Sequence, residues 1–371
     1  MHPLSPKEVI IHIARRILGE ARVHDYLIKR GIELRHLKDG YKNLETSENH
    51  EPSNGLFTEK ACGKRPFRQT LVFMADGKWM HGGLTDRLRG MTSAYKFAVE
   101  HNLDFKIFHT SPFLLQEILE PNKVNWIIDK HEISYDSNVA KPALLYREDF
   151  DNVSALERQL DSSHQQFHLY SCVDSVGKKF SEYFNILFKP SPLLMQELSR
   201  YNKILGTNYI SISFRFQNKL GDFKEFTFKE LPEKDKQKLM KASLEMLKRE
   251  ISLNNEKAIP TSGNEVEIGS SQMDMVKPNA SSTLVTADSP MFLAEAEKLP
   301  NVVTVKGNSI HIDFNGSKKV TDYLKAFTEF FLISKAAKAK LYRNSEYKTY
   351  PSNFPKYAAS LGNVPYEIIE E

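Results

Sequence analysis

The chain has 371 residues, of which 40% are hydrophobic and 26% charged, enough for two domains with sizeable cores. Its 51 Lys and Arg residues against 47 Asp and Glu residues leave a formal net charge of only +4, which argues against a nucleic-acid-binding protein. Cys62 and Cys172 are its two cysteines, so neither a disulfide framework nor a zinc site is predicted, and a reducing cytoplasm fits.

Residues 1–65 are predicted to form a basic helical extension followed by a polar linker. Apolar residues recur at helical spacing between residues 5 and 38, separated by Lys and Arg. Such a helix lies on an anionic membrane surface or packs on its own domain, and the pattern leaves both open. The sequence shows no signal peptide and no uninterrupted run of 18 apolar residues. We therefore expect a cytoplasmic protein, with contact to the inner face of a membrane through this helix as the further option.

Residues 66–188 are predicted to form a first α/β lobe. The stretch QTLVFMADG predicts a strand, a glycine turn then precedes a helix that reaches residue 99, and FKIFHT predicts a second strand. VNWIID and ALLYR are further strand candidates, residues 151–165 are polar, and KFSEYFNILF predicts a helix. This order is that of a Rossmann-like, mainly parallel sheet.

Residues 189–371 are predicted to form a second α/β lobe. Strands are predicted at YISISFRF, STLVTADS, NVVTV and AKLYRN, and helices after the two prolines of KPSP, from residue 231, at 290–299, at 322–334 and after TYPSN. A polar loop is expected at 252–280. Two Rossmann-like lobes facing across a cleft would suit a nucleotide-sugar enzyme, because ligands collect at the carboxyl ends of parallel strands.

The turn before the first helix of the first lobe is a candidate ligand contact. Gly82 and Gly83 allow backbone angles and close approaches that a side chain would block. The free N–H groups at the helix start suit an anion or a sugar hydroxyl. His81, Asp86 and Arg89 are the polar candidates beside them, and Asp86 and Arg89 can also pair with each other at i, i+3.

Polar residues also mark the ends of two predicted strands. Arg215 ends an apolar strand, where a guanidinium is costly to bury unless an anion meets it. That anion is a ligand, or else Asp222 or another carboxylate of the chain. Asp288 and Ser289 end STLVTADS, and with Pro290 at a first helical position they also suit a helix N-cap.

Ser352 and Asn353 begin the last predicted helix, where a hydroxyl caps the helix or, with neighbouring N–H groups, holds a phosphate. The sequence contains no GxxxxGK[ST], GxSxG or HExxH motif, so a phosphate-binding loop, a serine-hydrolase elbow and a zinc protease are excluded. Its 12 histidines show no ligand spacing, and we predict no structural metal.

Taken in order, these stretches resemble motifs of the GDP-fucose fucosyltransferase superfamily, which includes α-1,2-, α-1,6- and protein O-fucosyltransferases and the rhizobial nodulation fucosyltransferase. GGLTDRLRGMTSAYKFA is similar to its glycine-rich turn and helix, with Thr85 and Asp86 at the usual glycine and asparagine. SFRFQN is similar to the strand HxRRGD: Arg215 matches the arginine that contacts the donor diphosphate. Ser213 stands where the guanine-contacting histidine would be, and Phe216 replaces the second arginine.

Two further motifs extend the resemblance over roughly residues 68–371. VTADSPMF is similar to a strand whose final aspartate, here Asp288, reads the base. PSNFPKYAA is similar to a serine-rich helix start at which Ser352 would meet the diphosphate. The resemblance implies a GT-B architecture of two Rossmann-like lobes, with the acceptor on residues 66–188 and the donor on residues 189–371.

The resemblance also implies the chemistry, namely inverting, metal-independent transfer of a sugar from GDP-fucose to a glycan hydroxyl, with no cofactor. Arg215 would be catalytic, and Asp86 and His81 are candidates for the base. The implied donor contacts are Gly82, Gly83, Ser213, Arg215, Asp288, Ser289, Ser352, Asn353 and Phe354, and the implied acceptor contacts are His81, Asp86 and Arg89. The resemblance suggests bacterial surface polysaccharide synthesis as the setting. Ser213 favours the alternative of another nucleotide sugar, and a further alternative is a non-catalytic glycan- or nucleotide-binding relative.

Overall fold

The computed structural model describes residues 68–371, apart from residues 80, 146–151, 159, 161–162, 224–228, 259–281 and 315–316. The predicted basic extension, residues 1–65, lies outside the described residues. Two units divide the described chain. The first comprises the residues up to Gly82, Asp86–Ser111 and Val124–Gly177, and the second comprises Gly83–Thr85, Pro112–Lys123 and Lys178–Glu371.

The first unit is built on a parallel sheet, as the sequence predicts. Its strands are β1 (Thr70–Ala75), β2 (Asp104–His109), β4 (Ala140–Leu145) and β5 (Gln166–Ser171), in the order β2-β1-β5-β4. All neighbours are parallel. The central strand β1 is buried on both faces, which explains its unbroken apolar run.

Helix α3 (Leu84–Glu100) packs closely on this sheet because of one glycine. A Cβ on Gly90 would lie 2.4 Å from the carbonyl oxygen of Ser171 and 2.9 Å from the ring of Phe73. No L side chain fits at this distance, so Gly90 sets how near α3 comes to β1 and β5.

Three expectations for the first unit need correction. VNWIID is not a strand, because its backbone pairs only in an isolated bridge between Ile107 and Ile127. The polar interval contains helix α4 (Asn152–Glu157), and strand β5 follows it unpredicted. His168 on β5 is fully buried, and its ring is 3.0 Å from Gln166 Oε1. Gln166, which is half-buried, thus provides the buried His168 ring with a hydrogen-bond partner on the same strand.

The second unit is built on five parallel strands, confirming the predicted second α/β lobe. They are β7 (Ile210–Phe214), β8 (Thr283–Ala287), β9 (Val302–Val303), β10 (Lys338–Arg343) and β11 (Tyr366–Glu370), in the order β11-β10-β7-β8-β9. Numbered from β7 along the chain, this is the doubly wound order 3-2-1-4-5. The order reverses between β7 and β10, which is where such sheets bind ligands.

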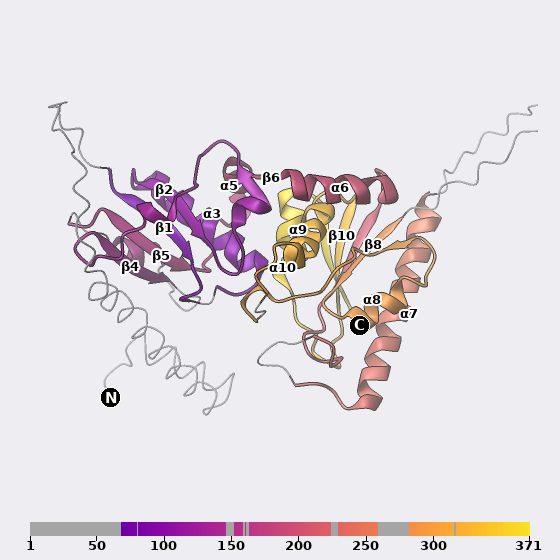
Figure 1. Cartoon of the computed structure of the whole chain (residues 1–371). Coiled ribbons are helices and arrows are strands. Elements are labelled where there is room, and N and C mark those ends of the chain that lie inside the picture. The colour runs from indigo at the N-terminus through magenta and orange to yellow at the C-terminus, as the bar shows by residue number, and fades with distance from the viewer. Residues whose placement is uncertain are drawn as a thin grey trace, which may run out of the picture. The chain divides into compact units, whose positions relative to one another are not determined.

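Helices cover both faces of the second sheet (Figure 1). The helices of the second unit are α5 (Phe180–Leu187), α6 (Pro192–Leu205), α7 (Glu233–Ala258), α8 (Pro290–Ala296), α9 (Thr321–Ile333) and α10 (Asn353–Leu361). α7 and α8 bury Ile212 and Phe214 of β7 in one apolar core. α9 and α10 pack together beyond the other face, toward which the alternate residues Ser211 and Ser213 point. Helix α7 reaches Ala258, so the loop expected from residue 252 begins later.

Short elements complete the two units. A two-stranded antiparallel ribbon joins β3 (Leu119–Pro121) to β6 (Phe188–Pro190) within the second unit. The 3-10 turns are Leu115–Glu117, Lys130–Glu132, Gly177–Lys179 and Ile312–Phe314. Among the helices of the described residues, none is both long and apolar enough to cross a membrane.

Candidate functional site

An ion pair joins the ends of β7 and β8, at the carboxyl edge of the second sheet. The register pairs Phe214 with Ala287, so the residues that follow, Arg215 and Asp288, leave the sheet side by side. Arg215 Nη1 donates to Asp288 Oδ2 at 2.8 Å, and the two side chains are 19% and 6% exposed. The guanidinium also lies over the ring of Phe223, 4.9 Å from its centre. Arg215 therefore pairs with a carboxylate of the chain itself, one of the two predicted possibilities, and that carboxylate is Asp288 rather than Asp222.

The Asp288 carboxylate also holds the chain that follows β7. Its Oδ1 accepts from the N–H of Phe216 at 2.9 Å, and its Oδ2 accepts from the N–H of Gln217 at 2.6 Å. Gln217 has a φ of 59°, a left-handed conformation that this anchoring supports. Burial raises the pKa of Asp288, while Arg215 and the two N–H groups oppose that rise. Because these donors occupy the buried carboxylate, the geometry favours a positioning role over the base contact predicted for Asp288.

Ser289 and Ser213 both use their hydroxyls within the fold. Ser289 is the N-cap of α8, as the sequence allows: its Oγ accepts from the N–H of Phe292 at 3.1 Å and donates to Asp222 at 2.7 Å. Ser213 is 3% exposed and accepts from Thr286 Oγ1 at 2.8 Å. Neither arrangement favours the predicted donor contact.

The N-terminus of α10 is the second polar feature near the reversal of strand order. Strand β10 lies beside β7, and the chain leaving its carboxyl end enters α10 at Asn353. Ser352 is the N-cap and accepts from the N–H of Phe354 at 3.2 Å, which confirms the predicted helix start. The ring of Phe354 contacts that of Phe330 on α9, with centres 5.5 Å apart.

The sequence reasoning missed a buried ion pair on α9. Lys325 and Glu329 pair with side chains only 3% and 9% exposed. Burial raises the pKa of Glu329, and the negative charge of Asp288 raises it further. The available signal was a Lys and a Glu at i, i+4 inside the otherwise apolar stretch YLKAFTEFFLI. Through Phe330, α9 contacts the first turn of α10.

The glycine turn at Gly82 and Gly83 shapes the start of α3. Gly82 has a φ of +86°, and a Cβ there would lie 2.5 Å from Asp86 Oδ2, so the turn requires glycine at this position. Gly83 has room for a Cβ. Asp86 forms the predicted ion pair with Arg89, and their side chains are 19% and 9% exposed. The pair is therefore mostly buried rather than a surface pair.

His81 is buried rather than presented to solvent. It is 2% exposed, and its Nδ1 lies 3.2 Å from the carbonyl oxygen of Ser171, to which it donates. Its ring lies against those of Phe73 and Tyr170. Burial, aided by the charge of Arg87, lowers the pKa of His81 to about 3. A group with this pKa is a weak base at neutral pH, so the geometry argues against the base role predicted for His81.

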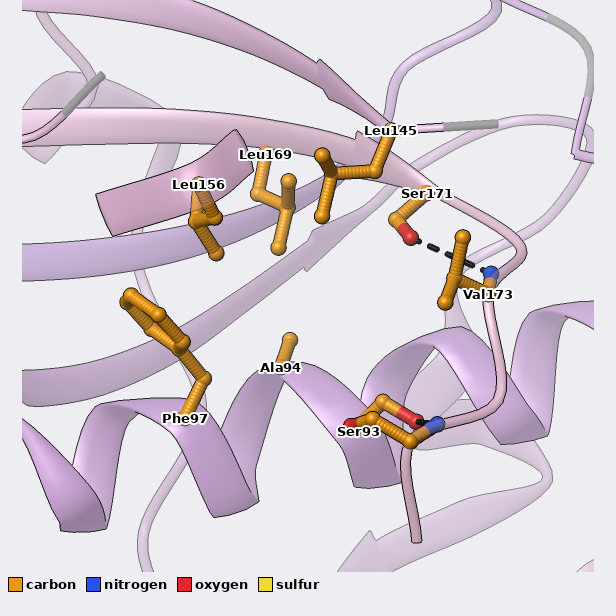
Figure 2. A pocket seen from close by; sticks show the side chains of 9 residues that line it. Ser93, Ala94, Phe97, Leu145, Leu156, Leu169, Ser171 and Val173 are labelled. Atoms are coloured by element: carbon orange, nitrogen blue, oxygen red, sulfur yellow. Dashed lines mark hydrogen bonds between the residues drawn. The ribbon is translucent and has the colours of Figure 1, made fainter. Parts of the chain in front are cut away.

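A small cavity lies in the first unit between α3, α4 and the ends of β4 and β5 (Figure 2). Its volume of about 20 Å³ is enough for a water molecule and far too small for a nucleotide. Most of the lining is apolar, and the hydroxyls of Ser93 and Ser171 already accept N–H groups from Ser175 and Val173. This cavity is a packing feature of the first unit.

Metal-ligating side chains do not gather anywhere in the part of the chain that the structure describes: no group of three or more His, Cys, Asp or Glu is arranged to hold an ion. Metal-independent chemistry stays a prediction.

Comparisons with known proteins give structural neighbours only. No protein family and no curated protein matches the chain. The fucosyltransferase NodZ from Bradyrhizobium is 13% identical with a TM-score of 0.49, over 82% of this chain and 96% of its own. A mutant of FUT1 from Arabidopsis thaliana in complex with GDP is 13% identical with a TM-score of 0.46, over 90% and 74%. POFUT1 in complex with GDP is 9% identical with a TM-score of 0.42, over 83% and 99%.

Proposed function

We propose that this chain is a glycosyltransferase of the fucosyltransferase type. It would transfer a sugar, fucose, from a GDP-linked donor to a glycan hydroxyl with inversion at the sugar carbon. The observation that carries the proposal is the position of Arg215: it follows β7, beside the reversal of strand order in a doubly wound parallel sheet. Ligands of such sheets bind there. The four motifs in their order support the fucosyltransferase type.

The residues at this edge suit a departing nucleoside diphosphate. Cleavage of the sugar–phosphate bond leaves negative charge on the diphosphate, and fixed positive groups lower the energy of that step. Arg215 supplies a guanidinium whose orientation Asp288 fixes. The N-terminus of α10, capped by Ser352, supplies N–H groups and the positive end of a helix dipole.

The acceptor side of the proposal rests on the turn before α3. An inverting transfer needs the acceptor hydroxyl deprotonated or positioned for attack. Asp86 is the better candidate base, because its carboxylate remains partly exposed, whereas His81 is buried with a low pKa. Arg89 holds that carboxylate in place. The acceptor, a glycan of a bacterial surface polysaccharide, is part of the proposal.

Calorimetry and an activity assay test the function. The purified protein should bind GDP more tightly than UDP or ADP and transfer fucose from GDP-fucose to a glycan. Arg215→Ala should lower turnover by about a hundredfold or more, the scale of losing one charge-stabilising group, with an unchanged circular dichroism spectrum. Near-normal turnover by a folded Arg215→Ala variant would remove the mechanism.

One specific observation favours an alternative function, in which the sugar donor carries a nucleotide other than GDP. Ser213, at the position of the family's guanine-contacting histidine, is 3% exposed with its hydroxyl engaged by Thr286. A glycosyltransferase with another nucleotide would bind UDP or ADP in preference to GDP in the same titrations. Binding without hydrolysis or transfer would instead indicate a non-catalytic relative.

A further inference from the structure

Helix α9 carries two buried charges that the proposed mechanism does not use. Lys325 and Glu329 are one helical turn apart, with side chains 3% and 9% exposed. Their neighbours on the helix, including Phe327 and Phe330, are buried and apolar. Taking two charges out of water is costly, and apolar residues of similar size often replace a buried ion pair without loss of stability. Packing alone therefore does not account for this pair.

The pair is connected to Asp288 through the chain between β9 and α9. Ser309 Oγ donates at 3.1 Å to the carbonyl of Ala287, the residue before Asp288. Two residues earlier, a Cβ on Gly307 would lie 3.3 Å from the Cβ of Lys325. The same short stretch thus touches both the end of β8 and the Lys325 side chain.

The charges in this region are arranged in a series. Arg215 pairs with Asp288, the stretch 307–309 contacts the end of β8 and approaches Lys325, and Lys325 pairs with Glu329. The negative charge of Asp288 also contributes to the raised pKa of Glu329. Another carboxylate near Lys325 is Glu297, whose pKa is lowered by its ion pair with Lys306 and further by the charge of Lys325. With all four groups ionised, the charges of Arg215, Asp288, Glu329 and Lys325 sum to zero. Without Lys325, and with both carboxylates still ionised, the sum is −1.

We propose that Lys325 and Glu329 are positioning residues for the donor site. Lys325 neutralises Glu329, so that a nucleoside diphosphate approaching Arg215 meets no excess negative charge from the two buried carboxylates. The pair acts through Asp288 and Arg215 and does not touch the donor. This inference rests on the proposed function, because it assigns the diphosphate to Arg215.

The two halves of the pair should change affinity differently. Lys325→Met removes the cation and should raise the Kd for GDP about tenfold at pH 8. The increase should be smaller at pH 6, where Glu329 and Asp288 take up protons more readily. Glu329→Gln removes an anion and should leave the Kd for GDP unchanged or lower it. Guanosine, which has no phosphate, should bind both variants as it binds the wild type.

Isothermal titration calorimetry with GDP and guanosine, at both pH values, measures these effects. A pair that only stabilises α9 would weaken both ligands in both variants, and that result would overturn the inference. Lys325→Arg should restore the wild-type Kd. The double variant Lys325→Met/Glu329→Gln should do so too, because it removes both charges, and a double variant as weak as Lys325→Met would contradict the proposal.

A second buried ion pair in the same unit provides the matched control. Lys340 on β10 pairs with Glu250 on α7, with side chains 14% and 8% exposed, on the other face of the sheet. Lys340 also pairs with Glu367 on β11 at 3.0 Å. Lys340→Met should leave the Kd for GDP unchanged, and a loss equal to that of Lys325→Met would overturn the inference.

A wrong proposed function would give a different result from a wrong inference about Lys325 and Glu329. If the wild type binds none of GDP, UDP and ADP, the donor assignment is wrong. The electrostatic connection is then judged without ligand, by a double-mutant cycle of unfolding free energies for Lys325→Met and Asp288→Asn. Non-additive effects support the connection, and additive effects overturn it.

Discussion

At the residue scale, the structure adds most to the interpretation of Asp288. The motif predicts a carboxylate that reads a base, whereas the structure shows one that accepts from Arg215 and from two backbone N–H groups. A buried acceptor with three donors favours the role of positioning the loop after β7 over the predicted contact with a base. The sequence could not predict that Asp288 bonds to Arg215 and to the chain after β7, because these bonds depend on β7 and β8 being neighbours in the sheet.

Asp288→Asn distinguishes the two roles. The amide would direct N–H groups at backbone donors, so we expect the free energy of unfolding to fall by about 1–3 kcal/mol. Through Arg215, affinity for GDP, UDP and ADP should fall by the same factor, as calorimetry measures. A change in the ratio of GDP to ADP affinity would instead show that Asp288 contacts the base.

His81 predicts a dependence of stability on pH. Its pKa is about 3 in the folded protein against 6.5 in the unfolded chain. Between these values the unfolded chain binds a proton that the folded chain does not. The free energy of unfolding therefore falls as the pH falls, by up to about 1.4 kcal/mol per pH unit.

Urea unfolding at pH 7, 6 and 5 measures this dependence. His168, whose pKa burial lowers to about 4, adds a second proton of the same sign. His81→Phe should remove about one proton from the uptake on unfolding. An unchanged slope in the His81→Phe variant would show that His81 is protonated or exposed in the folded state.

At the element scale, the contact between α3 and the first sheet depends on Gly90. Alanine normally favours a helix by about 1 kcal/mol over glycine. Here its Cβ would lie 2.4 Å from the carbonyl oxygen of Ser171, so the clash should outweigh that gain. We expect Gly90→Ala to lower the free energy of unfolding by about 1–3 kcal/mol.

Val99→Ala is the matched control for that measurement, because Val99 is on the same helix and 56% exposed. It should change the unfolding free energy by less than about 0.5 kcal/mol. A stabilised Gly90→Ala variant in urea unfolding would mean that α3 lies farther from β5 than the structure shows.

The elements show why the sequence predicted most of the fold but not all of it. Strands such as β1, β7 and β8 are buried on both faces and read as apolar runs. β5 contains Gln166 and His168, which bond to each other inside the sheet, so its polarity concealed it. In VNWIID, Trp126 is buried as in a strand, yet only Ile127 pairs. The local pattern of apolar residues predicts which side chains are buried, but it does not predict which backbone segments pair as strands.

For the candidate site, the sequence located the strand ends and helix starts but not the bonds among them. Arg215 and Ser352 follow recognisable local signals, a charge at the end of an apolar strand and an N-cap. The Lys325–Glu329 pair had a local signal too, but its connection to Asp288 depends on tertiary packing of α9.

At the scale of the whole molecule, the proposed function assigns the nucleotide to the second unit. Ligand binding should slow backbone hydrogen exchange where N–H groups become protected. We expect GDP to slow exchange in peptides that cover residues 210–223, 284–292 and 350–358. Peptides that cover β1 and β5 should exchange as before.

Hydrogen-exchange mass spectrometry with and without saturating GDP makes this comparison. Arg215→Ala at the same GDP concentration is the control and should show little added protection. Protection confined to the first unit would contradict the donor assignment.

Because the chain passes between the two units more than once, the second unit cannot be produced as one continuous fragment. Leu119–Pro121 belongs to the second unit and pairs with Phe188–Pro190, and the Ser191 hydroxyl that caps α6 donates to the carbonyl of Glu117 at 2.8 Å. A fragment starting at residue 178 would lack these partners and uncover Phe188, which is 2% exposed. Separate production of the second unit would therefore need residues 112–123 supplied in trans or joined by circular permutation.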